Sequence, residues 1–171
     1  MIDLYTWHTP NGRKVSIMLE EIGMDYNVHS INIAKDEQFQ PHFLKVSPNN
    51  RIPAIVDKDN NNYSLFESGA ILMYLAEKSG KLINKSNSDE YYRTIEWLMW
   101  QMGGVGPMFG QVHHFVKYNK GKSAYAEERY SKEARRLYGV MDKRLGQHQY
   151  ISGNEYSIAD ISIWPWTARF D

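Results

Sequence analysis

Two short stretches of the chain carry residues whose types and spacing suit the binding of a charged ligand. In the first, residues 64–66 form a predicted strand that leads directly into a helix, so Glu67 and Ser68 fall at the helix N-terminus. The free N–H groups and the positive dipole end of a helix favour a bound carboxylate there. Glu67 can meanwhile receive an ammonium group. Together these two residues suit the amino-acid end of an extended peptide.

The second stretch, Asn50-Arg51-Ile52-Pro53, comes just before the apolar residues 54–56. A proline at the first position of a strand costs no ladder hydrogen bond. A cis Ile52–Pro53 bond, a form that only X-Pro bonds adopt at tolerable cost, would turn the N–H and C=O of Ile52 outward as a free strand edge. Arg51 is interpreted either as a surface charge or as the partner of a ligand carboxylate.

Both stretches, with residues 5–12 (Tyr-Thr-Trp-His-Thr-Pro-Asn-Gly) near the start, resemble the glutathione site of cytosolic glutathione transferases. The similarity is greatest to the bacterial nu class, whose relatives include the yeast nitrogen-regulator prion. The resemblance covers the whole chain. It implies that glutathione is the substrate or cosubstrate, without a metal. It also implies a glutathione-dependent transferase or disulfide-bond reductase.

Thr9 and Asn11 lie in the turn between the first strand and the first helix, where thioredoxins and glutaredoxins carry cysteines. Thr and Asn also suit ordinary turns and helix caps, which is the simpler interpretation. The resemblance implies instead that both side chains donate to a bound sulfur and lower the thiol pKa from its free value of about 8.5. It also implies that the class lacks the catalytic Tyr of other classes, so Tyr5 is interpreted as a packing residue.

Three further residues are candidate glutathione contacts. Gln38 either holds the glycine carboxylate end, as the resemblance implies, or is an exposed helix residue. Arg129 lies on a charged helix and is either solvated or reaches the partner subunit's ligand, as a nearby Arg does in the class. Gln101 lies beside an expected helix kink and is kept as a candidate ligand contact in the same way as Arg129. The predicted catalytic residues are therefore Thr9 and Asn11, and the predicted ligand-binding residues are Gln38, Arg51, Ile52, Pro53, Glu67, Ser68, Gln101 and Arg129.

Two other motifs do not predict a site. His113 and His114 point in different directions on a helix and have no accompanying cysteine or carboxylate set, so we expect no metal there. The sequence Gly121-Lys122-Ser123 resembles the end of a phosphate-binding loop, but Val116 stands where the earlier glycine is required.

Composition limits the possible functions. The 171 residues allow one or two domains, and the 42% hydrophobic content is enough for a globular core. The 20 Lys and Arg residues balance the 20 Asp and Glu residues, which argues against a nucleic-acid partner held by bulk charge. We expect no membrane span and a cytoplasmic location. Cysteine is absent, which excludes any mechanism that uses a protein thiol.

The hydrophobic pattern of residues 1–80 predicts an α/β, thioredoxin-like domain with the order βαβαββα. The predicted strands are 2–7, 26–33, 55–57 and 63–66. The predicted helices are 10–22 with Gly23 as a cap, an irregular helix at 37–46, and one that Gly80 ends.

The polar residues 81–88 are the predicted linker, and residues 89–171 are the predicted all-α C-terminal domain. Ile95, Leu98, Met99 and Met102 form one apolar stripe, while Trp97 and Trp100 lie off it. This pattern suggests a helix that is buried on two faces. One face would pack within the chain and the other against a second subunit, so we expect a homodimer. Residues 103–107 should break or kink the helix. Residues 157–160 predict a capping box. Family members usually continue beyond Asp171, so the predicted C-terminal domain is truncated.

Two classes of function remain open. The resemblance favours an enzyme that reduces a small disulfide, and conjugation to an electrophile would use the same site. The alternative is a non-enzymatic module that binds glutathione or a protein through this fold.

Overall fold

The computed structural model describes residues 1–168 and divides the chain into two compact units, residues 1–83 and 84–171. Residues 169–171 at the end of the predicted C-terminal domain, Asp171 among them, lie outside the described residues. The domain limits given above, 1–80 and 89–171 with a linker at 81–88, stay predictions.

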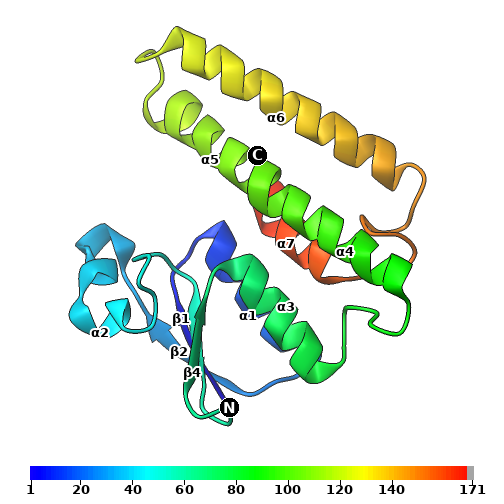
Figure 1. Ribbon diagram of the computed structural model, residues 1–171. Helices are drawn as coiled ribbons and strands as arrows, with labels where there is room; N and C mark the ends of the chain where they lie inside the picture. Colours follow the sequence, from blue (N-terminus) through cyan, green and yellow to red (C-terminus); the bar gives the residue numbers. More distant parts are fainter. Residues whose placement is uncertain (169–171) are drawn as a thin grey trace. The chain divides into compact units, whose positions relative to one another are not determined.

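The first unit is built on a mixed sheet of four strands in the order β2-β1-β3-β4 (Figure 1). Strand β1 pairs parallel with β2 and antiparallel with β3, and β3 pairs antiparallel with β4. This confirms the predicted thioredoxin-like arrangement. The strands are β1 (Ile2–Thr6), β2 (Tyr26–Ser30), β3 (Ala54–Asp57) and β4 (Tyr63–Phe66). The helices are α1 (Pro10–Ile22), η1 (Ile33–Lys35), η2 (Glu37–Phe39), α2 (Pro41–Leu44) and α3 (Ser68–Ser79).

Helix α1 follows from local signals that the sequence displays. Thr9 is the N-cap, and Pro10 occupies the first turn, where its missing N–H costs nothing. Helix α1 buries its apolar stripe and ends at Gly23, which takes a left-handed conformation with φ 69°. The buried stripe packs α1 against α3.

The second strand is shorter than predicted. It ends at Ser30, because the Asn32 side chain accepts a hydrogen bond from the N–H of Ala34 and starts the short helix η1. This local bond competes with strand pairing. The predicted irregular helix at 37–46 is two short helices, η2 and α2.

A buried carboxylate fixes α3 to the sheet. Asp57, at the end of β3, is fully buried and accepts hydrogen bonds from Tyr74 Oη at 2.6 Å and Lys78 Nζ at 2.5 Å. Burial raises the pKa of Asp57, but the bonds from Lys78 and Tyr74 outweigh it and hold the pKa below its usual value. The charged form is therefore favoured in the fold.

The second unit is helical, as predicted. Residues 101–105 do not break the long helix but carry it through a π-helical turn, and Pro107 then lies in the first turn of the next helix. Of the two predicted outcomes, a break or a kink, the break is excluded, because a π-turn absorbs the glycines without ending the helix. The helices are α4 (Ser88–Trp100), η3 (Gln101–Val105), α5 (Gly106–Val112), η4 (His113–Tyr118), α6 (Ala124–Leu145) and α7 (Ile158–Thr167).

The two tryptophans of α4 belong to the core of this unit. Trp97 and Trp100 are half-buried, stack edge to face at 5.1 Å, and pack on a cluster that includes Val105, Phe109 and Leu137. Met99 is instead 47% exposed. The tryptophans that lie off the predicted stripe therefore pack within this unit, whereas Met99 of the stripe is exposed.

The start of α7 confirms the predicted capping box. The Ser157 side chain accepts a hydrogen bond from the N–H of Ala159, and the Asp160 carboxylate accepts one from the N–H of Ser157. A second Asp160 oxygen accepts from the N–H of Ile151 at 2.9 Å, which ties the preceding loop to the helix. Within residues 1–168, no helix is long and apolar enough to cross a membrane.

Candidate active site

The directions of three strands bring most of the predicted site to one edge of the sheet. Tyr5 of β1 lies opposite Ala54 of β3, and Ala54 lies opposite Phe66 of β4. Because both pairings are antiparallel, the end of β1, the beginning of β3 and the end of β4 meet there. The segments that continue from these ends are the Thr9 turn, the Ile52–Pro53 segment and the start of α3.

In the Thr9 turn, the Thr9 hydroxyl oxygen is the acceptor of a helix-capping hydrogen bond. Thr9 Oγ1 accepts a hydrogen bond from the N–H of Gly12 at 3.1 Å, and a hydroxyl has one proton to give besides. A Cβ on Gly12 would lie 2.4 Å from both Thr6 Oγ1 and the Trp7 carbonyl oxygen. Only glycine therefore fits where the turn closes on β1. Asn11 is half-buried in the first turn of the same helix.

The start of α3 carries the predicted pair of ligand-binding residues. Glu67 is exposed and has a positive φ of 72°, a conformation uncommon for a side chain other than glycine. Asn49 Nδ2 donates to its carboxylate at 3.4 Å. Ser68, the first residue of the helix, is only 3% exposed. An acid and a hydroxyl thus lie side by side at a helix N-terminus, where an ammonium and a carboxylate of one ligand can be bound.

The segment before β3 has the shape that the sequence suggested. The Ile52–Pro53 peptide bond is cis, Pro53 is buried and Ile52 is half-buried. The hydroxyl of Ser47 donates to the Arg51 carbonyl at 2.8 Å and closes the turn. The Arg51 side chain is exposed and donates to Asn50 Oδ1 at 3.2 Å, in keeping with the surface-charge interpretation.

Gln38 is not the exposed helix residue that one interpretation expected. It lies in η2 and is only 7% exposed, and its Nε2 donates to Asp36 Oδ1 at 3.4 Å. Its Oε1 is buried and has no hydrogen-bond partner in the described structure. Buried amide oxygens are normally satisfied, so this atom is a candidate ligand contact.

Lys14 is a residue of this region that the sequence interpretation missed. It is 1% exposed in the second turn of α1, and its Nζ donates to Ser68 Oγ at 3.3 Å. Burial lowers the pKa of Lys14 to about 7, although the negative charge of Glu67 opposes the shift. The signal was present in the sequence, since Lys14 lies four residues before Met18 and therefore falls on the buried face of the helix.

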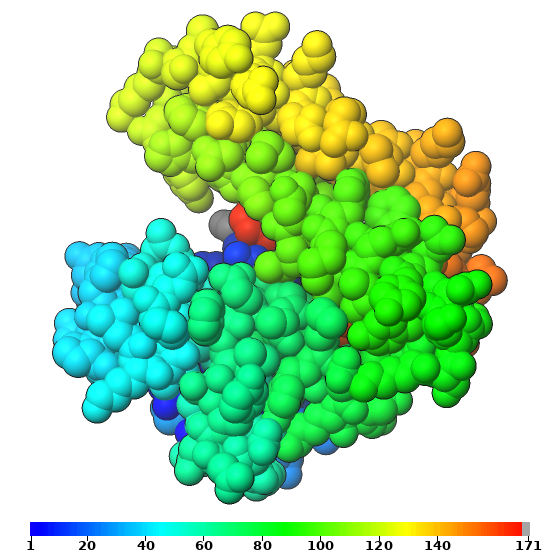
Figure 2. All heavy atoms as spheres, in the orientation of Figure 1, coloured from blue at the N-terminus to red at the C-terminus, as the bar shows by residue number. Residues whose placement is uncertain are grey.

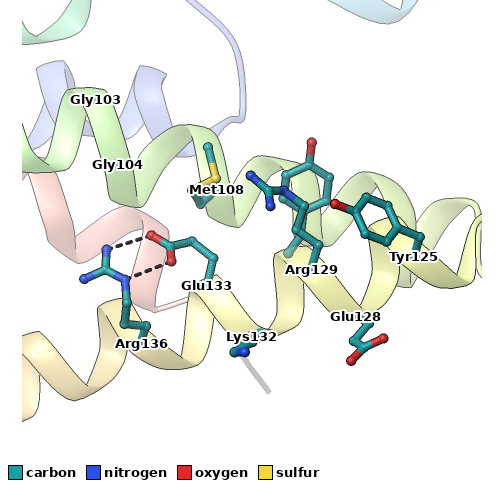
Figure 3. Close-up of a pocket in the computed structure, with 10 residues that line it drawn as sticks. Gly103, Gly104, Met108, Tyr125, Glu128, Arg129, Lys132, Glu133 and Arg136 are labelled. Atoms are coloured by element: carbon teal, nitrogen blue, oxygen red, sulfur yellow. Dashed lines mark hydrogen bonds and ion pairs between the residues drawn. The ribbon is translucent and has the colours of Figure 1, made fainter.

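The two remaining predicted residues, Gln101 and Arg129, belong to the second unit. Gln101 is fully buried in the π-turn. Arg129 is exposed on α6 and lines an open hollow of about 740 Å³ between α6 and the η3–α5 segment (Figure 3). In that view Arg129 and Met108 extend into the hollow from opposite sides, and Glu133 pairs with Arg136 at 2.7 Å.

No group of three or more His, Cys, Asp or Glu residues within residues 1–168 is arranged to hold a metal ion. His113 is buried instead, and its Nδ1 lies 2.9 Å from the Phe109 carbonyl oxygen of the preceding turn. At the sheet edge, the groups described above that can act on a ligand are the hydroxyls of Thr9 and Ser68, the amides of Asn11 and Gln38, and the Glu67 carboxylate.

Residues 1–77 match the family model for the glutathione S-transferase N-terminal domain, and residues 124–171 match the model for the C-terminal domain. The chain is 50% identical over 170 residues to the disulfide-bond oxidoreductase YfcG of Escherichia coli K12, which covers 97% of this chain and 79% of YfcG. The chain belongs to the glutathione S-transferase family. A second member of that family, the disulfide-bond oxidoreductase YghU of the same organism, is 42% identical over 96% of this chain and 59% of its own length.

Solved structures of the family agree with this fold. A glutathione transferase family member from Pseudomonas fluorescens with two glutathione molecules bound has a TM-score of 0.93 and 52% identity, covering 98% of this chain and 75% of its own. A glutathione transferase from Pseudomonas putida with one glutathione disulfide bound per subunit has a TM-score of 0.90 and 48% identity, covering 97% and 74%.

Replacing Gly12 by alanine should destabilise the first unit. The added methyl group overlaps the Trp7 carbonyl oxygen, which is backbone and cannot turn aside, so we expect a loss of about 1–3 kcal/mol in the free energy of unfolding. Gly139→Ala is the matched control, because it lies exposed in the interior of α6 with open space around it. That variant should gain about 0.5–1 kcal/mol. Urea unfolding measures both, and equal stabilities would contradict the close contact.

Proposed function

We propose that the protein binds glutathione at the edge of the sheet described above and uses its thiolate to reduce small disulfides. The observation that carries this proposal is the meeting of the Thr9 turn, the Ile52–Pro53 segment and the Glu67–Ser68 pair at that edge. The relatives named as disulfide-bond oxidoreductases and the family structures with bound glutathione or glutathione disulfide support it.

In this proposal each part of glutathione meets a different group. The γ-glutamyl ammonium and carboxylate bind Glu67 and Ser68 at the start of α3. The extended peptide follows Ile52 before Pro53, and Gln38 and Arg51 are candidates for the glycine end. The sulfur then lies at the start of α1, where the Thr9 hydroxyl and the Asn11 amide donate to it.

The reaction consumes two glutathione molecules, because reducing one disulfide takes two electrons and each glutathione supplies one. Since the chain has no cysteine, both attacking thiolates come from glutathione. One glutathione thiolate attacks a sulfur of the disulfide RSSR and forms a mixed disulfide, and the departing RS⁻ takes up a proton. A second glutathione thiolate attacks the glutathione sulfur of the mixed disulfide and releases a second RS⁻ and glutathione disulfide. Two thiols are thereby oxidised and one disulfide is reduced. The protein contributes position and thiolate stabilisation.

Turnover of glutathione with 2-hydroxyethyl disulfide, coupled to the NADPH-dependent reduction of glutathione disulfide, tests this function. We expect turnover well above the uncatalysed rate. Turnover of an aryl halide with glutathione but none of any disulfide would show conjugation instead. Glutathione binding without turnover of either substrate would favour the non-enzymatic module. Absence of glutathione binding would overturn the proposal altogether. We propose a cytoplasmic location, which fits the abundance of reduced glutathione that this reaction consumes.

Glu67→Gln should weaken glutathione binding with little effect on folding. The substitution preserves the shape of the side chain but removes the charge that receives the ammonium group, so we expect a loss of about 1.5–3 kcal/mol in binding free energy. Glu21→Gln, at an exposed position on α1, is the control and should bind like the unaltered protein. Calorimetry measures both, and unchanged affinity in Glu67→Gln would exclude this role.

Thr9→Val should raise the pKa of the bound glutathione thiol, because it deletes a donor to the thiolate. In the unaltered protein the bound thiol ionises below the free value of about 8.5. Affinity therefore strengthens as pH rises from the bound pKa to the free pKa and is constant above it. Thr9→Ser keeps the hydroxyl and is the control, and Asn11→Ala should act independently. Ultraviolet absorbance of the thiolate gives each midpoint; identical midpoints would leave the helix dipole and backbone N–H groups as the cause.

The protein should form a homodimer, in which Arg129 approaches the partner's glutathione; the complete burial of Gln101 speaks against the same role for that residue. The support is the set of large exposed side chains on α4 and α6, since Tyr92, Met99 and Tyr125 are 67%, 47% and 74% exposed. Figure 2 shows atoms of α4 (green) on the surface in view. Sedimentation at micromolar concentration should give a dimer, and Tyr92→Glu with Met99→Glu should give a monomer. A monomer in the unaltered protein would contradict this proposal.

A further inference from the structure

The hollow in the second unit is a feature that the proposed function has used only in part. It has a volume of about 740 Å³ and is lined by α6 on one side and by η3 and α5 on the other (Figure 3). Ligand sites in proteins commonly have volumes of about 300–1,000 Å³ and combine apolar walls with a few polar groups. The side chains that line this hollow therefore indicate what it can bind.

The wall formed by η3 and α5 is apolar and partly without side chains. Gly103 and Gly104 lie in the π-helical turn, and Met108 follows in α5. A Cβ on Gly103 would have nothing within 4 Å, and its φ is not positive, so neither packing nor backbone conformation requires a glycine there. Glycine destabilises a helix relative to alanine. The bare backbone is thus a surface that the fold itself does not need, and a flat group can approach it closely.

The wall formed by α6 carries charge, and among the described residues three cationic and two acidic side chains line the hollow. Arg136 donates to both oxygens of Glu133, from Nε at 2.8 Å and from Nη2 at 2.7 Å. The bonds from Arg136, aided by the charge of Arg129, hold the pKa of Glu133 below its usual value. This carboxylate is therefore ionised and already paired. In Figure 3, Glu128 and Lys132 extend from the side of α6 that faces away from α5.

Arg129 provides a positive charge that a ligand can use. Its guanidinium extends into the hollow opposite Met108, and it makes no hydrogen bond or ion pair within residues 1–168 (Figure 3). Tyr125 and Tyr130 also line the hollow; Tyr125 is 74% exposed, and the Tyr130 ring stacks on Phe115 at 5.4 Å. A guanidinium binds a carboxylate through two parallel hydrogen bonds. Tyrosine hydroxyls are further donors.

We propose that the hollow binds a planar aromatic carboxylate. The carboxylate pairs with the Arg129 guanidinium. The aromatic ring lies between the tyrosine rings of α6 and the opposite wall, in contact with the Met108 thioether and the glycine backbone, and both sulfur–aromatic and ring–ring contacts are favourable. The excess of positive charge selects an anion over a neutral molecule of the same shape. The flat glycine surface selects a planar group over a bulky one.

Calorimetry with 2-naphthoate, in the absence of glutathione, tests the proposal. Glutathione is left out because, in the homodimer proposed above, Arg129 also approaches the partner's glutathione. The unaltered protein should bind 2-naphthoate about 10- to 100-fold more tightly than the neutral 2-naphthamide, which is the usual effect of a charge-assisted hydrogen bond. It should also bind 2-naphthoate more tightly than adamantane-1-carboxylate, which carries the same charge but is not planar. Equal affinity in either comparison would overturn the inference.

Variants with matched controls locate the ligand. Arg129→Gln removes the charge and should weaken 2-naphthoate binding about 10- to 100-fold. Arg135→Gln, at an exposed position on α6 that does not line the hollow, is its control and should bind like the unaltered protein. Gly103→Leu places a side chain in the open space at the wall of the hollow and should abolish binding. Gly139→Leu, which also meets open space but lies outside the hollow, should leave binding unchanged.

The outcomes are distinguishable. If Gly103→Leu does not fold, Arg129→Gln and Arg135→Gln still decide, because both side chains are exposed; equal affinities of these two variants would show that the hollow is not the site. Glu67→Gln, which is expected to lose glutathione, should bind 2-naphthoate normally. A parallel loss would place the ligand at the sheet edge instead and overturn the inference. Binding of 2-naphthoate by a protein that does not bind glutathione would support the hollow and overturn only the proposed glutathione site.

Discussion

The antiparallel pairing of β3 with both β1 and β4 is the constraint on which the candidate active site depends. The register sets Tyr5, Ala54 and Phe66 in one row across the sheet. The segments that continue from this row, at residues 9, 53 and 67, are brought together by the pairing of these strands. The local signals that shape each segment, a cap, a proline and a helix start, would otherwise act at separate places in the chain.

Two helix N-termini, those of α1 and α3, lie next to strands that end at this edge. Each offers free N–H groups and a positive dipole end. A chain without cysteine cannot attack a disulfide with a thiol of its own, so its contribution to the proposed thiol chemistry is to position the ligands and to stabilise the thiolate. The Thr9 turn shows how closely the start of α1 packs against β1. Gly12 allows the turn to close on β1, and the bond from its N–H occupies the Thr9 oxygen while the hydroxyl proton remains available.

Gly12 and Thr9 are residues that their local backbone favours, whereas Lys14 is buried although a lysine side chain prefers to be exposed. A buried ammonium is unfavourable by itself, and the Lys14 side chain lies on the apolar face of α1. Its described hydrogen-bond acceptor, Ser68, is 54 positions away in the sequence. Lys14 is thus buried against its intrinsic preference, in contact with a predicted ligand-binding residue.

The sequence by itself determined those features that depend on near neighbours: the cap and proline of α1, the glycine that ends it, the capping box at Ser157 and the order of strands and helices. Ordered motifs also carried the family resemblance and most of the candidate site. Only the tertiary structure decided that Gln38 is buried, that Trp97 and Trp100 join the core while Met99 is exposed, and that the helix continues through residues 101–105. Burial is a property of what packs against a side chain, and those partners lie far away in sequence, so no local pattern specifies them.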